Sequence, residues 1–194
     1  MGSLRIIGGE HGSRRISVPA SVARPTVDRV REALFSSIGS MRGGFEGARV
    51  LDAFAGSGAL ALEALSRGAA FACMVDSDRQ AAKVARENAS SLGYGEHQAA
   101  VICADALAAP ARTASFGPFD IVFLDPPYAL APAEARAFLD ALSEVGALAA
   151  DAVISYEHAA DSTSAVEAAF AREGFGIVRQ KRYGKTQVTL LTLG

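Results

Sequence analysis

The sequence predicts an α/β fold with a doubly wound, mostly parallel seven-stranded sheet whose last strand is antiparallel. A small N-terminal appendage, made of a β-hairpin and a helix, is expected to precede it. Three observations support this prediction. Apolar runs alternate with helix-periodic segments along most of the chain. Runs such as 121–124 are continuously apolar, as in strands covered on both faces. A short turn near the C-terminus joins two final strand-like segments, which is typical of an antiparallel hairpin.

Residues 1–42 form the appendage in this prediction, and residues 43–194 form the main domain. Segments 4–7 and 15–18 flank a glycine-containing loop and are expected to pair as a β-hairpin. A helix follows, for which Thr26 is the candidate N-cap. The chain length is sufficient for one domain with such an appendage.

The main domain alternates strands and helices. Five apolar segments are expected to form its parallel strands: 48–53, 70–75, 98–102, 119–124 and 152–156. Four segments are expected to form helices: 59–67, 78–92, 132–144 and 162–173. The final hairpin is expected to pair 175–182 with 187–193, and the Ala-rich stretch 145–152 is interpreted as helix and loop.

Charge is distributed unevenly along the chain. The net charge of −2 combines about +4 on residues 1–42 with about −6 on the remainder. All seven basic residues of the first segment are Arg, whose planar group binds phosphates and stacks on bases. A nucleic-acid-facing patch is one interpretation, and a scattered set of solvated surface arginines is the other. A second small basic cluster lies near the C-terminus: Arg179, Lys181, Arg182 and Lys185.

Several classes of protein are excluded by composition. No apolar run reaches the ~18 residues of a membrane span, and the N-terminus lacks the apolar core of a secretory signal. Cys73 and Cys103 are too few for a disulfide scaffold or a Cys-rich metal site, and both are expected to be buried. We expect a cytoplasmic, soluble monomer without a metal.

A glycine loop follows the first strand of the main domain. Gly56-Ser57-Gly58 lies between that strand and a helix start, where open α/β sheets bind ligands. Asp76 ends the next strand, 18 residues after Gly58, and can accept hydrogen bonds from ribose hydroxyls. Asp105 follows the third strand and can accept a hydrogen bond from an adenine amino group.

Two cofactors compete for this loop. Gly56-x-Gly58-x-x-Ala61 matches the dinucleotide pattern of NAD sites. Asp52, four residues before Gly56, would repel a pyrophosphate but suits a cationic ligand such as S-adenosylmethionine (SAM). Acids at the ends of three successive strands favour SAM, although each acid alone is also compatible with a helix cap or a surface charge.

The segment Asp125-Pro126-Pro127-Tyr128 directly follows an apolar strand. Two prolines end the strand and hold the turn rigid. An exocyclic amine of a purine is a poor nucleophile because its lone pair is delocalised into the ring. If Asp125 and the Pro126 carbonyl accept the two amine hydrogens, the lone pair can point at a methyl carbon, and Asp125 stabilises the developing positive charge. Tyr128 can stack on the base. The alternative is a strand-ending loop with a capping Asp.

Together these two motifs resemble those of the class I, Rossmann-like, SAM-dependent amino-methyltransferases. More narrowly, residues 24–35 (RPTVDRVREALF), the opening 5–9 (RIIGG) and Tyr183-Gly184-x-Thr186 resemble the RsmD family, which methylates the exocyclic N2 amine of a guanine in 16S ribosomal RNA. The resemblance covers essentially the whole chain and implies the same activity, SAM as cofactor and 16S rRNA, within a small-subunit ribosomal particle, as partner.

The resemblance also implies roles for individual residues. Asp52, Gly56 and Gly58, with Phe54 and Ser57 of the same loop, would hold the methionine part of SAM, Asp76 its ribose and Asp105 its adenine. Residues 125–128 would hold the extruded guanine. The residues expected to contact RNA are Arg14, Arg15, Arg24, Thr26 and Arg29.

Alternative functions remain open at this point. An adenine-amine DNA methyltransferase shares the chemistry, but the chain is too short for a sequence-reading domain. A non-catalytic RNA-binding assembly factor would not need the intact Asp125 and Gly58. An NAD-dependent reductase is the last alternative. Glu157 and His158, at the end of a predicted strand, are further candidates for lining the site.

Overall fold

The computed structural model describes residues 2–19 and 28–194, which form two compact units. The first unit ends at Ala106 and the second runs from Leu107 to Gly194. The boundary predicted between residues 42 and 43 stays a prediction, and Thr26, the expected helix cap, lies outside the described residues. Within the described part of the chain, every helix is too short or too polar to cross a membrane.

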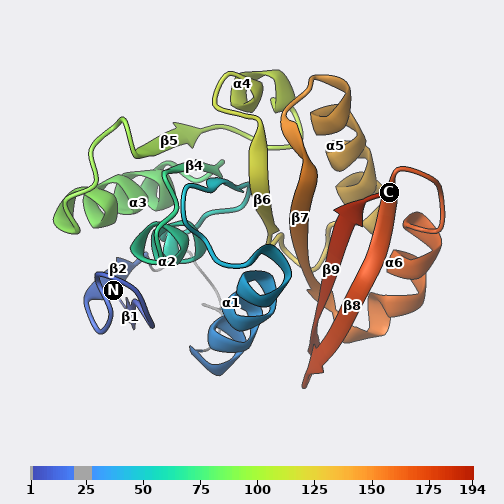
Figure 1. Ribbon diagram of the computed structural model, residues 1–194, viewed down its shortest axis with the longest axis horizontal. Coiled ribbons are helices and arrows are strands. Elements are labelled where there is room, and N and C mark those ends of the chain that lie inside the picture. The colour runs from blue at the N-terminus through green and yellow to red at the C-terminus, as the bar shows by residue number, and fades with distance from the viewer. Residues whose placement is uncertain (1, 20–27) are drawn as a thin grey trace. The chain divides into compact units, whose positions relative to one another are not determined.

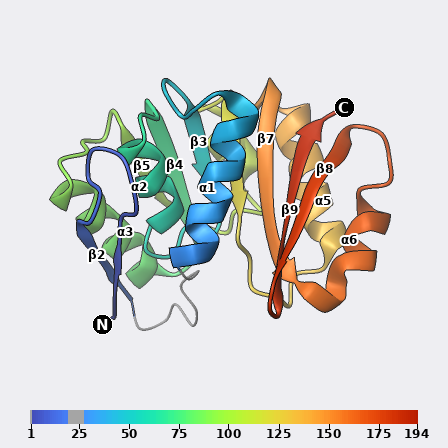
Figure 2. The same cartoon turned by 60° about the horizontal axis from the view of Figure 1, so that its bottom comes forward.

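The first unit contains a three-stranded parallel sheet in the order β5-β4-β3 (Figure 1 and, with all three strands labelled, Figure 2). The strands are β3 (Arg49–Asp52), β4 (Phe71–Asp76) and β5 (Ala99–Cys103). The central strand β4 is buried from Phe71 to Val75, as its continuous apolar sequence predicts. Two helices connect the strands: α2 (Ala59–Ser66) and α3 (Arg79–Ser91).

The N-terminal hairpin pairs β1 (Gly2–Arg5) with β2 (Arg15–Val18). It docks on α2 through Glu63, a carboxylate with no solvent exposure. The two Glu63 carboxylate oxygens accept hydrogen bonds from the backbone N–H groups of Ile7 at 2.6 Å and Gly8 at 2.9 Å. Contact is so close that a Cβ on Gly9 would lie 1.8 Å from the Ser66 carbonyl oxygen. The hairpin is therefore held by buried polar contacts in addition to the buried side chains of Ile6, Ile16 and Val18.

Helix α1 (Asp28–Arg42) buries Val30, Leu34 and Ile38 at helical spacing. Its first residue, Asp28, pairs with Arg5 of the hairpin at 2.7 Å and with Arg31 at 2.8 Å. These two hydrogen bonds, that from Arg31 foremost, lower the pKa of Asp28. Arg31 has no solvent exposure and also donates to the Arg5 carbonyl oxygen at 2.7 Å. The start of α1 is thus clamped to the hairpin.

The second unit contains four strands in the order β6-β7-β9-β8 (Figure 1). These are β6 (Phe119–Leu124), β7 (Leu148–Ala159), β8 (Phe175–Tyr183) and β9 (Thr186–Leu193). Strands β6 and β7 are parallel, whereas β9 runs antiparallel to both β7 and β8. Three α-helices belong to this unit: α4 (Pro110–Ala114), α5 (Pro132–Glu144) and α6 (Thr163–Ala169).

Aromatic contacts join the helices and strands of the second unit. Phe170, which follows α6, lies 6.3 Å from Tyr156 of β7 and 6.4 Å from Phe175 of β8, measured between ring centroids. The guanidinium of Arg136 on α5 stands over the Phe170 and Phe175 rings. This cluster fixes α5 and α6 on one face of the strands.

The expected seven-stranded, mostly parallel sheet with an antiparallel last strand is confirmed, and so is the N-terminal hairpin. The interpretation of 145–152 as helix and loop is wrong, because β7 already begins at Leu148. The helix expected over 162–173 is shorter, since α6 ends at Ala169, and α4 was not predicted. Cys73 is buried, but Cys103, at the end of β5, is exposed, contrary to expectation.

Candidate functional site

Three acidic side chains lie at the carboxyl edge of the first unit's sheet. Asp52 is the last residue of β3, Asp76 is the last residue of β4, and Asp105 follows two residues after β5. Because these strands are parallel and adjacent, their ends share one edge. Asp76 is half-buried and Asp105 is exposed. The structure thus brings together the acids that the sequence singles out.

Asp52 contacts the N-terminus of α2. Its side chain is 1% exposed, and its Oδ2 accepts a hydrogen bond from the Ala61 backbone N–H at 3.2 Å. The carboxylate therefore occupies the electropositive helix end at which a dinucleotide places its pyrophosphate. A phosphate there would meet a buried negative charge, whereas a cationic ligand would be stabilised by it. This contact supports SAM over NAD.

The glycine loop is shaped by Asp76 as well as by its own glycines. The Gly56 N–H donates to Asp76 Oδ2 at 2.7 Å, and the Asp78 N–H donates to Asp76 Oδ1 at 2.8 Å. Gly58 has a φ of +79°, and a Cβ there would lie 2.7 Å from the sulfur of Met74 on β4. Gly58 is thus required by packing against the neighbouring strand, in addition to the ligand approach that the sequence suggests.

The other predicted residues of this loop differ in exposure. Phe54 is half-exposed, whereas Ser57 is 4% exposed. The Ser57 carbonyl oxygen accepts a hydrogen bond at 2.9 Å from the Nδ2 of Asn88, a residue of α3 that the sequence reasoning missed. Asn88 also exchanges two 2.9 Å hydrogen bonds with the backbone of Ser17 in β2. One buried amide therefore links the glycine loop to the N-terminal hairpin. A polar, weakly helix-forming residue on the apolar side of α3 was the available signal.

The Asp-Pro-Pro-Tyr loop lies in the second unit, immediately after β6. Asp125 is half-buried, Pro126 is buried, and Pro127 is exposed. The loop turns back on itself, since the Leu130 N–H donates to the Pro127 carbonyl oxygen at 2.9 Å. Tyr128 is 45% exposed, and its hydroxyl forms a hydrogen bond with the hydroxyl of Thr186, the first residue of β9. The turn thus positions an accessible aromatic ring.

The residues expected to contact RNA are partly described. Arg14, Arg15 and Arg29 are exposed, as an RNA-facing role requires. Arg14 donates to the Ser91 carbonyl oxygen at 3.1 Å, and Arg15 donates to the Ser3 hydroxyl. Arg24 and Thr26 lie outside the described residues, so their expected roles stay predictions.

His158 is a core residue of the second unit. It is 3% exposed, its Nδ1 donates to the Ala159 carbonyl oxygen, and its Nε2 accepts from the Thr189 hydroxyl, both at 2.9 Å. Burial lowers the pKa of its imidazole. Within residues 2–19 and 28–194, the His, Cys, Asp and Glu side chains form no group of three that could hold a metal ion.

A parallel sheet with acids at the ends of its strands, a glycine loop and an antiparallel last strand is the architecture of class I, Rossmann-like methyltransferases. The solved structure of SMU.776 in complex with SAH has this fold: its TM-score is 0.63 at 16% identity, covering 84% of this chain and 48% of that one.

The chain belongs to the family described as Conserved hypothetical protein 95, whose model matches residues 4–192. It is 40% identical over 157 residues to ribosomal RNA small subunit methyltransferase D of Escherichia coli K12, which covers 80% of this chain and 75% of the relative. The structure of yhhF from Escherichia coli has a TM-score of 0.81 at 34% identity and covers 99% of this chain and 98% of that one. The resemblance to the RsmD family is confirmed.

Proposed function

We propose that this protein methylates the exocyclic N2 amine of a guanine in 16S ribosomal RNA, acting as a monomer in the cytoplasm on a small-subunit ribosomal particle. Family membership makes it a SAM-dependent rRNA methyltransferase. The base, the atom, the particle, the compartment and the monomeric state belong to the proposal.

The glycine loop and its acids suit SAM. SAM supplies a methyl group on a positively charged sulfur. An amine lone pair can attack the methyl carbon, and the sulfur is the leaving group. We expect Asp52, Phe54, Gly56, Ser57 and Gly58 to bind the amino-acid part, Asp76 the ribose and Asp105 the adenine. The buried carboxylate of Asp52 at the start of α2 is the feature that selects a cation here.

The target amine is assigned to the Asp-Pro-Pro-Tyr loop. Asp125 and the Pro126 carbonyl oxygen would accept the two amine hydrogens and so direct the nitrogen lone pair at the methyl carbon. As the N–C bond forms and the C–S bond breaks, positive charge develops on the nitrogen, and the Asp125 carboxylate stabilises it. The surplus amine proton then leaves through Asp125 or directly to water.

One observation carries this assignment. The loop holds a half-buried carboxylate beside a buried proline, and an accessible tyrosine ring is tied by its hydroxyl to Thr186. A fixed aromatic ring next to two hydrogen-bond acceptors is suited to a planar base that carries an NH₂ group. The choice of guanine rests on the family resemblance.

The test is incubation of the protein with methyl-labelled SAM and unmethylated small subunits, followed by mass mapping of the rRNA. We expect one labelled N2-methylguanine. Naked 16S rRNA and duplex DNA serve as parallel substrates. Label on adenine in DNA would support the DNA methyltransferase alternative, and tight RNA binding without SAM binding would support a non-catalytic assembly factor.

Asp125→Asn tests the chemistry directly. We expect kcat to fall by about 10²-fold or more with SAM affinity nearly unchanged. The matched control is Asp151→Asn, which removes an exposed carboxylate of the same unit and should leave the rate unchanged. Normal turnover of the Asp125 variant would overturn the proposed amine chemistry.

A further inference from the structure

Within the second unit, acidic side chains predominate before residue 174, and only basic ones occur from residue 174 onward. Residues 107–173 contain ten acidic and three basic side chains, whereas residues 174–194 contain no acidic and four basic ones. The four are Arg179, Lys181, Arg182 and Lys185. All four are exposed, and all belong to β8 or to the turn that joins it to β9. The C-terminal hairpin is thus a basic element on an acidic unit.

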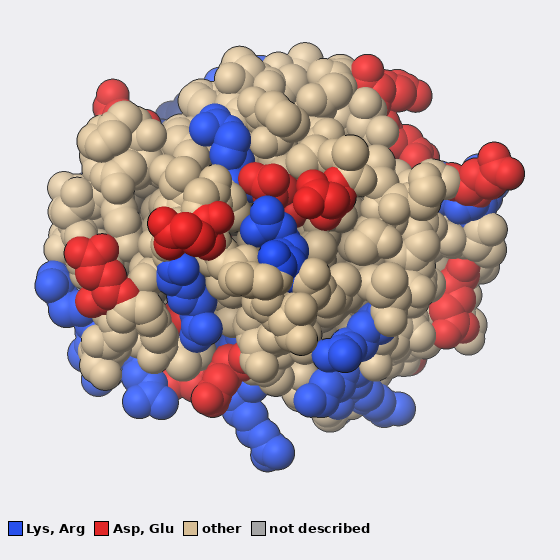
Figure 3. Space-filling view, in the orientation of Figure 1, with Lys and Arg blue, Asp and Glu red and all other residues tan. Residues whose placement is uncertain are grey.

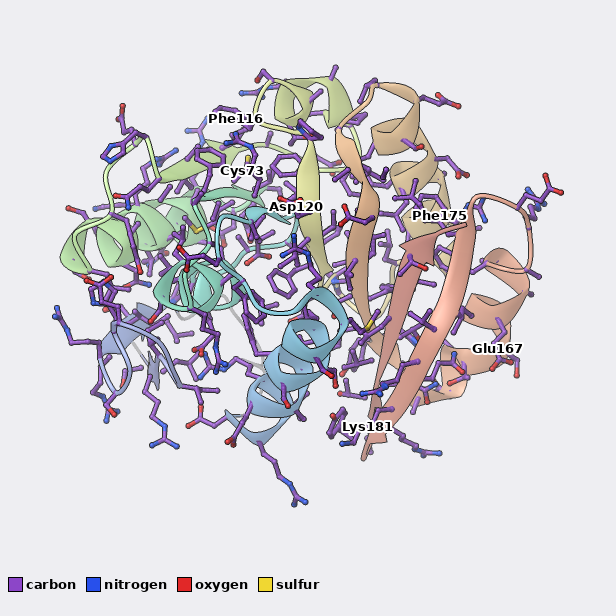
Figure 4. The ribbon with its side chains drawn as sticks, viewed as in Figure 1. Cys73, Phe116, Asp120, Glu167, Phe175 and Lys181 are labelled. Atoms are coloured by element: carbon purple, nitrogen blue, oxygen red, sulfur yellow. The ribbon has the colours of Figure 1, made fainter. Side chains whose placement is uncertain are left out.

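The basic side chains surround the end of this hairpin instead of forming one flat face. Strand β8 lies at the edge of the sheet and pairs only with β9. Lys181 stands opposite Val188 and Arg182 stands opposite Gln187, so these neighbouring basic side chains project from opposite faces. Lys185 lies in the turn between the strands. Figure 4 shows Lys181 near the hairpin end, and Figure 3 shows basic side chains gathered over the same region.

Acidic partners do not neutralise the charges of three of these residues. Among the described residues, neither Lys181, Arg182 nor Lys185 takes part in an ion pair. The Arg182 Nε donates instead to the Gly184 carbonyl oxygen at 2.9 Å, and the Lys181 ammonium lies 5.3 Å from the centroid of the Tyr183 ring. Both contacts leave the positive charge available to an anion.

The same hairpin end touches the Asp-Pro-Pro-Tyr loop. Thr186, the first residue of β9, pairs with Tyr183 across the strands and forms the hydrogen bond with the Tyr128 hydroxyl. Lys181, Arg182 and Lys185 are therefore close in sequence to Thr186, the residue that contacts the ring we assign to the target base. A base held at Tyr128 would bring the phosphates of its flanking nucleotides to this end of the hairpin.

We propose that the end of the β8–β9 hairpin, carrying Lys181, Arg182 and Lys185, binds the phosphate backbone of the RNA strand on one side of the methylated nucleotide. This inference rests on the proposed function. It adds a contact surface in the second unit to the arginines of the N-terminal segment. Contacts from both faces of a narrow hairpin end suit a flexible single strand that can bend around it.

Basic residues on an edge strand have another known use, which is to prevent edge-to-edge pairing between copies of a protein. The two roles predict different results when these charges are removed. A phosphate-binding role predicts weaker, less salt-dependent RNA binding when the charges are removed. A protective role predicts self-association with RNA affinity unchanged.

The test compares two double variants that remove the same charge from the same unit. Lys181→Gln with Lys185→Gln alters the hairpin, and Arg112→Gln with Arg172→Gln removes two exposed arginines elsewhere. Binding of a 16S rRNA fragment that contains the methylation site is measured at a series of salt concentrations, together with SAM affinity by calorimetry and oligomeric state by light scattering.

We expect the hairpin variant to bind the fragment on the order of tenfold more weakly at low salt, with the slope of log K against log[salt] reduced by about 1.5. SAM affinity should stay unchanged, and the control variant should behave like the unaltered protein. Equal RNA binding by the two variants, or self-association alone, would overturn this inference while the function stands. If the unaltered protein neither binds nor methylates the RNA, the proposed function itself fails.

Discussion

The two β-hairpins both carry basic side chains, but they are held to the protein in different ways. The β1–β2 hairpin has two four-residue strands and is anchored by polar groups of the helices: Glu63 on α2, Asn88 on α3, and Asp28 and Arg31 on α1, which both contact Arg5. The β8–β9 hairpin has longer strands and continues the sheet through the β7–β9 ladder. The short hairpin buries only a few apolar side chains, among them Ile6 and Ile16, and polar anchors add to this packing.

This difference predicts at which hairpin a substitution can affect RNA binding without affecting the stability of the fold. In the first hairpin, the exposed arginines depend on a few buried contacts, so changing an anchor should affect both folding and binding. In the second hairpin, the backbone ladder supplies the support, so its exposed side chains should be replaceable at little cost in stability. Four substitutions test this contrast, in order of decreasing expected effect.

Glu63→Ala should have the largest effect. It removes the acceptor for the Ile7 and Gly8 N–H groups and the partner of Arg67, and should lower the free energy of unfolding by about 3 kcal/mol. Urea denaturation measures the loss, and hydrogen exchange at the two amides locates it. Glu63→Gln, which keeps one acceptor, should lose less. A change below about 1 kcal/mol for the Ala variant would show that the hairpin does not depend on this anchor.

Asn88→Ala should lower the free energy of unfolding by about 2 kcal/mol, because it leaves groups of Ser17 and Ser57 without their amide partner. It should also weaken SAM binding by about fivefold, the value of one hydrogen bond to the glycine loop. Ser90→Ala, an exposed position on the same helix, is the control and should change neither quantity. Unaltered SAM affinity in the Asn88 variant would mean that the loop keeps its shape without this contact.

Asp28→Asn should give a pH-dependent loss of about 1 kcal/mol at neutral pH, limited by the 40% exposure of this carboxylate. Hydrogen bonding from Arg31 lowers the pKa of Asp28 below 3.8, so its stabilisation is present above that pH and is lost as the pH falls through the folded-state pKa. Unfolding curves of the two proteins should therefore converge in acid. A difference that is constant with pH would exclude the ion pair as its source.

Thr186→Val should have the smallest effect, about 0.5 kcal/mol or less, because it removes one hydrogen bond at the surface of the second hairpin. Tyr128→Phe completes a double-mutant cycle with it, measured by thermal unfolding. A loss as large as that of the Glu63 variant would remove the contrast between the hairpins.

Much of the fold is accessible from the sequence because apolar periodicity and glycines report local structure. Strand β6 and helix α5 lie where their patterns predict. The start of β7 at Leu148 was missed because its Ala residues favour no strand, and pairing of Leu148 with Phe119 of β6 extends it. The exposure of Cys103 was missed because burial at the end of a strand depends on what lies beyond it.

In the candidate site too, some features follow from local sequence patterns and others depend on tertiary packing. Acids and glycines at strand ends are visible in the sequence because the topology rule places them at one edge. The Asn88 bridge joins residues that are 71 positions apart, and the Tyr128–Thr186 contact joins residues 58 apart. Such pairs depend on tertiary packing, which no local pattern encodes. The preference of Asp52 for a cationic ligand is predicted from its position before Gly56, whereas its hydrogen bond with the Ala61 N–H in the first turn of α2 is visible only in the structure.

The docking of the N-terminal hairpin on helix side chains has a consequence for biosynthesis. The hydrogen bond of Ile7 requires Glu63, which lies 56 residues later in the chain, and that of Ser17 requires Asn88, 71 residues later. The N-terminal hairpin therefore cannot reach its final position until α2 and α3 have been translated. During that interval the exposed arginines of the hairpin are accessible to nucleic acid although the hairpin has not yet docked.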